Sequence, residues 1–210
     1  MFEAHRLAGQ RGSNALFSDV RFVVEAGEAL IVTGVNGSGK TTLLRMLAGL
    51  AHPDDGEIRW NGQRVEPLDP RWRRDVLYCG HSYAIKRELS AAENLAALAE
   101  LAGESVDDAG VHSALDEAAI GLQQRALPAR SLSAGQQRRI GLARLRLVRR
   151  ALWVLDEPAT ALDAAASELL SNWVGEHLIR GGVAVVATHQ PLSVDGARVK
   201  TLTLGRRRST

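Results

Sequence analysis

The chain has 210 residues, of which 45% are hydrophobic and 24% are charged, and this is the composition of an ordinary globular protein. Its length suits one compact domain, or one domain with a smaller inserted lobe, and excludes two independent enzymes. The 26 basic and 24 acidic residues leave a net charge of +2, so the charge does not indicate a nucleic-acid-binding protein. The single cysteine, Cys79, excludes an internal disulfide.

Segments for secretion or membrane insertion are not expected. No apolar run approaches the roughly 18 residues of a membrane-spanning helix. Residues 1–10, MFEAHRLAGQ, have an acidic residue and a histidine where a signal peptide would carry a basic and then an apolar run. We therefore expect a soluble protein that stays in the compartment where it is made.

Strand and helix signals alternate along the chain. Residues 15–33 and 56–78 are short apolar segments separated by turn residues, which predicts β-strands, and residues 41–50 between them predict one helix. From residue 91 to about residue 150, apolar residues recur at helical spacing, with Leu95, Leu98 and Leu101 on one face. This middle stretch predicts a helical lobe at about residues 85–150.

The last third of the chain predicts a parallel sheet. Residues 152–156, LWVLD, form an apolar run too short for a helix, which is typical of a strand buried on both faces. A helix with Leu170, Trp173 and Val174 on one face follows, and a second apolar run at residues 183–188 comes after it. Strand, helix and strand in this order imply a right-handed crossover and an α/β core.

A phosphate-binding loop is the strongest functional signal. Residues 34–41, GVNGSGKT, match the pattern G-x-x-x-x-G-K-[ST] completely, between an apolar strand and a helix. The glycines let several backbone N–H groups turn toward one anion, Lys40 would reach the β- and γ-phosphates, and the Thr41 hydroxyl would hold Mg²⁺. We expect the triphosphate of ATP to be bound by Gly34, Val35, Asn36, Gly37, Ser38, Gly39, Lys40, Thr41 and Thr42.

Two carboxylates and a histidine are expected at the same edge of the sheet. Asp156 ends the first buried strand, where it would bind Mg²⁺ through water, and Glu157 would orient and polarise the water that attacks the γ-phosphate. His189 closes the next strand and would contact the γ-phosphate. Such residues at strand ends are by themselves more often structural, but the phosphate loop favours the catalytic interpretation.

The segment LSAGQQRR at residues 132–139 resembles the signature of ABC ATPases, with Leu132, Ser133, Ala134, Gly135 and Gln136 at the signature positions. TALD, at residues 160–163, resembles the D-loop of that family and ends in Asp163. With the phosphate loop, the acidic pair and His189, the resemblance covers essentially the whole chain. It implies an α/β P-loop NTPase with an ABC ATPase core, an antiparallel β subdomain and the inserted helical lobe, all in one domain over residues 1–210.

The resemblance also implies a homodimer. In ABC ATPases the signature serine and glycine bind the γ-phosphate of ATP that the other subunit's loop holds, and Ser133 and Gly135 match those positions. Two positions depart from the family pattern. His81 stands where the Q-loop carries a glutamine, and the amino-terminal loop offers only Arg11 or Phe17 where the family has an aromatic adenine contact.

Residues 80–95, GHSYAIKRELSAAENL, resemble one subfamily, the ATP-binding subunits of the cytochrome c maturation system, also called haem exporter ATPases. This resemblance implies an ATPase that lies peripherally on the cytoplasmic face of the bacterial inner membrane and energises integral-membrane permease subunits. The cargo is haem, or the work is the release of a haem-loaded chaperone. No nucleic-acid partner is expected. Direct metal or haem binding is not expected either, because Cys79 and His81, which should face alike at a strand end, are too few ligands.

Three alternatives remain open from the sequence. The chain is the ATPase subunit of an ABC exporter for another substrate, a soluble ABC ATPase that acts on nucleic acid or ribosomes, or a nucleotide sensor without turnover. The second class usually carries two cassettes or long insertions, whereas this chain has one cassette. Glu157 and His189 argue against the third, because a sensor has no need of a catalytic base.

Overall fold

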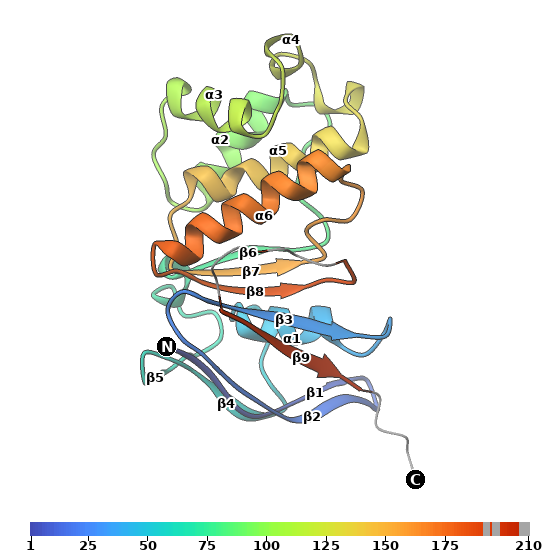
Figure 1. Ribbon diagram of the computed structural model, residues 1–210, viewed down its shortest axis with the longest axis vertical. Coiled ribbons are helices and arrows are strands. Elements are labelled where there is room, and N and C mark those ends of the chain that lie inside the picture. The colour runs from blue at the N-terminus through green and yellow to red at the C-terminus, as the bar shows by residue number, and fades with distance from the viewer. Residues whose placement is uncertain (191–193, 195–197, 206–210) are drawn as a thin grey trace. The chain divides into compact units, whose positions relative to one another are not determined.

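The computed structural model describes residues 1–190, 194 and 198–205 (Figure 1). The chain divides into two compact units. The first unit comprises Met1–Gly80, Arg150–Pro158 and Val174–Thr210, and the second, which we call the helical unit, comprises His81–Arg149 and Ala159–Trp173. The helical unit therefore takes in the predicted lobe at about residues 85–150 and, in addition, the residues that follow the acidic pair.

Two sheets build the first unit. The antiparallel sheet has the strand order β2-β1-β4-β5, and the parallel sheet has the order β6-β7-β8-β3-β9. The strands of the antiparallel sheet are β1 (Phe2–Arg11), β2 (Asn14–Val24), β4 (Asp55–Trp60) and β5 (Gln63–Arg64). Those of the parallel sheet are β3 (Glu28–Gly34), β6 (Val76–Cys79), β7 (Leu152–Asp156), β8 (Val183–Ala187) and β9 (Arg198–Leu204).

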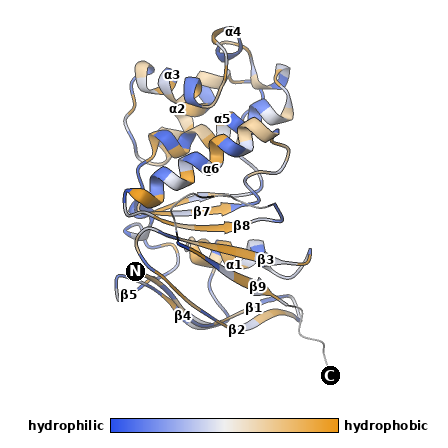
Figure 2. Cartoon of the chain, in the orientation of Figure 1, coloured by the Kyte–Doolittle hydropathy of each residue, from blue (hydrophilic) through white to orange (hydrophobic). Residues whose placement is uncertain are grey.

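The centre of the parallel sheet is buried on both faces. Every residue of β7 and β8 is buried, which explains why both strands are continuous apolar runs (Figure 2). Helix α1 (Lys40–Leu47) packs on β3, β7 and β8 through an apolar face that includes Leu43, Leu44 and Leu47. The predicted α/β fold with an antiparallel β subdomain is confirmed.

Four aromatic rings form the core beneath the antiparallel sheet. Phe2 is fully buried and lies between the rings of Phe22, Trp60 and Trp72 at centroid distances of 5.8, 5.9 and 6.0 Å. Trp72 comes from a short 3₁₀ turn, η1 (Trp72–Arg74), which precedes β6. The aromatic cluster therefore joins the two sheets of the first unit, because β1, β2 and β4 contribute three of the rings and the segment that leads into β6 contributes the fourth.

The helical unit is built around α5 (Ala134–Leu147). Helices α2 (Ala91–Leu101) and α3 (Asp108–Glu117) pack on α5, and the unit also contains α4 (Leu122–Arg125), η2 (Ala129–Ser131) and the first part of α6 (Ala164–Ile179). The helix predicted from the spacing of Leu95, Leu98 and Leu101 is present as α2, and Leu95 and Leu98 are buried in it. Leu101 is 86% exposed, because α2 ends at this residue and the side chain lies at the open end of the helix. Among the described residues, no helix is long and apolar enough to cross a lipid bilayer.

His177 of α6 is held in its neutral form. Its ring stacks on Trp153 of β7 at a centroid distance of 4.0 Å and an interplanar angle of 5°, and its Nε2 lies 3.1 Å from the Val183 carbonyl oxygen. Burial lowers the pKa of His177 to about 4, and the hydrogen bonds to backbone carbonyls oppose this shift only in part. The unfolded chain therefore binds this proton more tightly than the folded chain does.

We expect this histidine to make the fold sensitive to acid. Its contribution to stability is fully present above the unfolded pKa of about 6.5 and is lost as the pH falls toward 4, by about 1.4 kcal/mol for each pH unit in between. Urea unfolding at several pH values, compared between the parent and His177→Phe, measures the effect. The variant keeps a ring on Trp153 and should show a shallower loss between pH 6.5 and 4; equal slopes for the two proteins would contradict the assignment.

Candidate nucleotide-binding and hydrolysis site

The phosphate loop connects β3 to α1 through a backbone that only glycine adopts readily. Gly34, Gly37 and Gly39 have φ angles of 144°, 80° and 97°. At Gly34 a Cβ atom would lie 2.5 Å from the Leu204 carbonyl oxygen and 2.7 Å from Ser38 Oγ. Both distances are shorter than any real Cβ contact, so the loop cannot accept a side chain at its first position. A turn with this backbone lets several N–H groups approach one ligand closely.

Lys40 is a buried cation at the start of α1. The residue is 8% exposed, and its Nζ donates a hydrogen bond to the Gly34 carbonyl oxygen at 2.8 Å. The same Nζ lies 3.0 Å from His189 Nε2. An ammonium group buried in this way is held over the loop, where phosphate oxygens are expected.

Two oxygen atoms of the site are buried without a partner among the described residues. They are Ser38 Oγ in the loop and Asp156 Oδ2 at the end of β7. A buried carboxylate oxygen without a hydrogen bond is costly unless a cation compensates it. Hard oxygen donors are the ligands that Mg²⁺ prefers, so Asp156, together with the Thr41 hydroxyl on the first turn of α1, fits this ion.

Glu157 has an unusual backbone conformation. Its φ of 49° is in the left-handed region, which is uncommon for a residue with a side chain, and its N–H donates to the Ala187 carbonyl oxygen at 2.8 Å. This hydrogen bond continues the β7–β8 pairing by one residue and fixes the turn at the sheet edge. Strained backbone of this kind is found preferentially at functional sites.

His189 joins the loop to Glu157. It follows β8, its side chain is 48% exposed, and its Nε2 lies 3.2 Å from Glu157 Oε1. The same nitrogen lies 3.1 Å from Asn36 Oδ1, in addition to its contact with Lys40. The structure therefore brings Lys40, Asn36 and Glu157, all predicted site residues, to within 3.2 Å of one ring nitrogen of His189. The contact between Asn36 and His189 was not predicted. The sequence pattern predicts that the backbone N–H groups of the loop bind phosphate, and it gives no role to the Asn36 side chain.

The signature residues lie in the helical unit, at the beginning of α5. Ser133 is the N-cap: its Oγ accepts a hydrogen bond from the Gln136 N–H at 3.2 Å, and the Gln136 side chain accepts one from the Ser133 N–H at 2.8 Å. Ser133 and Ala134 are exposed and Leu132 is buried. This amino terminus therefore presents backbone N–H groups and the positive end of a helix dipole to an anion.

Two further residues of the helical unit were predicted from the family pattern. Asp163 caps α6, since its Oδ1 accepts a hydrogen bond from the Ala166 N–H at 2.8 Å. His81 is exposed and follows β6.

A residue that sequence reasoning missed is Tyr83, whose ring lies 4.3 Å from the Arg138 guanidinium carbon and against Gly141 of α5. The signal was available in the sequence, because a glycine inside α5 indicates a close neighbour.

Two minor predictions are corrected. Cys79 and His81 do not face alike at a strand end, because β6 ends at Cys79, which is 1% exposed, and the chain turns before His81. Phe17 is not available to a base, because it is 6% exposed and its ring packs against Gly9 and Gly39. Arg11, at the end of β1, is exposed and remains the candidate for the adenine contact.

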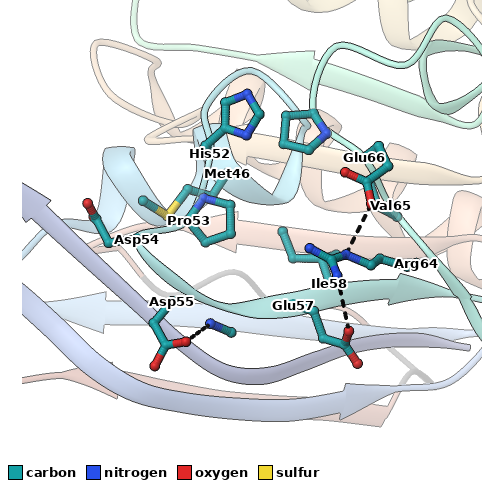
Figure 3. Close-up of a pocket in the computed structure, with 12 residues that line it drawn as sticks. Met46, His52, Pro53, Asp54, Asp55, Glu57, Ile58, Arg64, Val65 and Glu66 are labelled. Carbon is teal, nitrogen blue, oxygen red and sulfur yellow. Dashed lines mark hydrogen bonds and ion pairs between the residues drawn. The ribbon is translucent and has the colours of Figure 1, made fainter.

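A second concavity in the first unit contains none of the predicted residues (Figure 3). Its volume is about 230 Å³, and its polar side chains are largely paired: Arg64 lies between Glu57, at 4.0 Å, and Glu66, at 3.1 Å. Asp54 accepts a hydrogen bond from the Gln10 N–H and Asp55 accepts one from the Gly56 N–H. The polar side chains of this concavity are thus mostly paired with one another or with backbone N–H groups, and the concavity contributes no residue to the candidate nucleotide site.

Comparison with known proteins gives a consistent result. The family model described as ABC transporter matches residues 17–160. A curated relative from Dechloromonas aromatica, named cytochrome c biogenesis ATP-binding export protein CcmA, is 46% identical over 206 residues, which are 98% of this chain and all of that protein. A solved ATP-binding subunit of an ABC transporter superposes with a TM-score of 0.84 at 25% identity, over 98% of this chain and 86% of that one. A bacterial ABC transporter cassette solved as a dimer superposes with a TM-score of 0.82 at 22% identity, over 97% of this chain and 94% of that one.

The geometry at Gly34 gives a direct test of the phosphate loop. We expect Gly34→Ala to weaken ATP binding by at least about tenfold, because both the left-handed backbone and the close carbonyl oxygen oppose a Cβ atom. Gly62→Ala is the matched control, since Gly62 also has a positive φ of 79° but no atom lies near its missing Cβ. Titration with a fluorescent ATP analogue measures both variants, and parental affinity in Gly34→Ala would contradict the role of the loop.

Proposed function

The chain belongs to the ABC transporter family and, within it, to the cytochrome c biogenesis ATP-binding export proteins, and from this premise we propose that it is the ATP-hydrolysing subunit of a membrane complex in c-type cytochrome biogenesis. One observation carries the proposal. Lys40, Glu157 and His189, which are far apart in the sequence, meet beside a glycine loop at distances of 3.0 and 3.2 Å from one histidine nitrogen. Both units together constitute one ABC ATPase domain.

The residues of the first unit bind and orient the triphosphate. The loop amides from Gly34 to Thr42 surround the β-phosphate, and Lys40 exchanges its contacts with Gly34 and His189 for β- and γ-phosphate oxygens. Thr41 and Asp156 would hold Mg²⁺, and the ion would supply positive charge beside the phosphates. The orphaned Oδ2 of Asp156 supports this assignment.

Glu157 and His189 act on the terminal phosphate. Glu157 accepts a hydrogen bond from the attacking water and draws its proton, while the oxygen attacks the γ-phosphorus and the bond to ADP breaks. His189 donates a hydrogen bond to a γ-phosphate oxygen. The products are ADP and inorganic phosphate.

A second copy of the chain completes each site. Leu132, Ser133, Ala134, Gly135 and Gln136 form the signature, and Ser133 with the amides at the start of α5 binds the γ-phosphate held by the partner's loop. Asp163, in the D-loop, and His81, in the Q-loop position, belong to the segments that respond to this closure. Nucleotide therefore holds two protomers head to tail, and hydrolysis releases them.

The complex that this subunit serves is membrane-bound. We place the chain peripherally at the cytoplasmic face of the bacterial inner membrane, where it energises integral-membrane permease subunits of the cytochrome c maturation system. The cargo is haem, or the work is release of a haem-loaded chaperone. Support comes from the names of the relatives and from the GHSYAIK segment that follows β6.

Replacing the proposed base tests the reaction itself. We expect Glu157→Gln to lose at least about 100-fold in ATP turnover, because an amide cannot take the proton of the attacking water, while ATP affinity stays near that of the parent. Phosphate release measures turnover, and gel filtration with ATP should show a stable dimer of the variant. Turnover at the parental rate in Glu157→Gln would exclude this residue as the base.

The arrangement of the signature in trans has its own test. Lys40→Ala and Gly135→Asp should each be inactive alone, because each homodimer has two defective sites. An equal mixture should recover about a quarter of the parental turnover, since half of its dimers are mixed and each of these has one intact site. If loop and signature acted within one chain, the mixture would stay inactive.

A further inference from the structure

The Nε2 atom of His189 has more neighbours than it can satisfy. Lys40 Nζ lies at 3.0 Å, Asn36 Oδ1 at 3.1 Å and Glu157 Oε1 at 3.2 Å. A neutral imidazole nitrogen carries either one proton or one lone pair, so it cannot accept from an ammonium group and donate to an oxygen in the same tautomer. The tautomer of His189 therefore decides which of these neighbours the ring serves.

The three neighbours differ in how far they depend on a hydrogen bond with His189. Lys40 already donates to the Gly34 carbonyl oxygen at 2.8 Å and does not depend on the histidine alone. Asn36 and Glu157 both present oxygen atoms to Nε2, and both oxygens require the Nε2–H tautomer. That tautomer is also the only neutral form that can donate a hydrogen bond from Nε2 to a phosphate oxygen.

Of the two oxygens, that of Asn36 is suited to hold this tautomer until a γ-phosphate oxygen replaces it as the acceptor. The carboxylate of Glu157 must be available to the attacking water, so it cannot be committed to His189. The Asn36 amide takes no part in proton transfer, carries no charge that would repel a phosphate, and belongs to the same glycine loop that binds the nucleotide. Its oxygen therefore orients the ring without interfering with the base.

We propose that Asn36 is a positioning residue for His189: its Oδ1 accepts the Nε2–H and fixes the tautomer and orientation of the ring before the γ-phosphate arrives. This inference rests on the proposed function and deepens it, because it assigns a role to one side chain of a loop that is expected to act through its backbone. Asn36 does not touch the reacting atoms in this role. It acts through His189, by removing the tautomer that would bind Lys40 instead.

A spectroscopic measurement tests the proposal without nucleotide. In the full chain labelled with ¹⁵N-histidine, long-range ¹H–¹⁵N correlation spectra distinguish Nε2–H from Nδ1–H imidazoles. All variants are compared in a Glu157→Ala background, because Glu157 Oε1 would otherwise hold the same tautomer in the nucleotide-free chain. We expect Nε2–H for His189 when Asn36 is present, a shift of population toward Nδ1–H in Asn36→Ala, and retention of Nε2–H in Asn36→Asp, which keeps an oxygen at the same position. Val23→Ala, at an exposed valine of β2 outside the candidate site, is the control and should leave the spectrum unchanged.

Kinetics give the second readout. We expect Asn36→Ala to lower kcat by about tenfold, the effect of one ordinary hydrogen bond, with less than about a twofold change in KM. Asn36→Asp should recover kcat at saturating ATP but raise KM, because its charge repels the phosphates. An unchanged tautomer in Asn36→Ala, or a change confined to KM, would overturn the role of Asn36.

Failure of this inference is distinguishable from failure of the proposed function. If the parent hydrolyses ATP and Glu157→Gln does not, but His189 keeps the same tautomer with and without Asn36→Ala in the Glu157→Ala background, only the positioning role is lost. If the parent has no ATPase activity, the proposed function fails, whereas the tautomer measurement still reports on the contact between Asn36 and His189.

Discussion

The site depends on one constraint, the parallel pairing of three strands, two of which, β7 and β8, are buried along their whole length. Because β3, β7 and β8 run in the same direction and in register, their carboxyl ends meet at one edge of the sheet. The chain leaves these ends as the phosphate loop, as Glu157 and as His189. Apolar residues of the strands therefore set the distances of about 3 Å among the polar groups that we propose to act on nucleotide.

The same constraint leaves the site with polar groups that the protein does not fully satisfy. Asp156 is buried at the end of β7 with one oxygen unpaired among the described residues, and Lys40 is buried over the loop with a carbonyl and an imidazole as neighbours. Burying such groups lowers the stability of the folded chain, and a ligand that supplies the missing charge restores it. A cation at Asp156 and phosphates at Lys40 would do this together, so the burial of these two groups supports the proposed magnesium complex of a nucleotide over either component alone.

Much of this arrangement could be predicted because its signals are local. A glycine loop between a strand and a helix, a short apolar run that ends in two acids, and a serine followed three residues later by a glutamine are each readable within a few residues. The failures concern burial. Phe17 follows a glycine-rich turn and looked free to stack on a base, but the absence of side chains at Gly9 and Gly39 lets its ring enter the core. The partners of His189 were likewise unpredictable as a set, because Asn36 and Glu157 approach it only after the sheet has formed.

The division of phosphate-binding groups between two units explains why ATP can act as a switch. The first unit carries the loop, Lys40 and the sheet edge that are proposed to surround a phosphate, whereas the helical unit carries an exposed helix end at Ser133. At that end the Ala134 and Gly135 N–H groups have no intrahelical acceptor, and a Cβ at Gly135 would lie 3.2 Å from the Ala161 carbonyl oxygen. In the proposed dimer, a γ-phosphate between the loop of one protomer and this helix end of its partner would attract both, and its departure would remove the attraction from both at once. Hydrolysis would thus change how strongly the two protomers are held together, and a membrane partner could use this change as mechanical work.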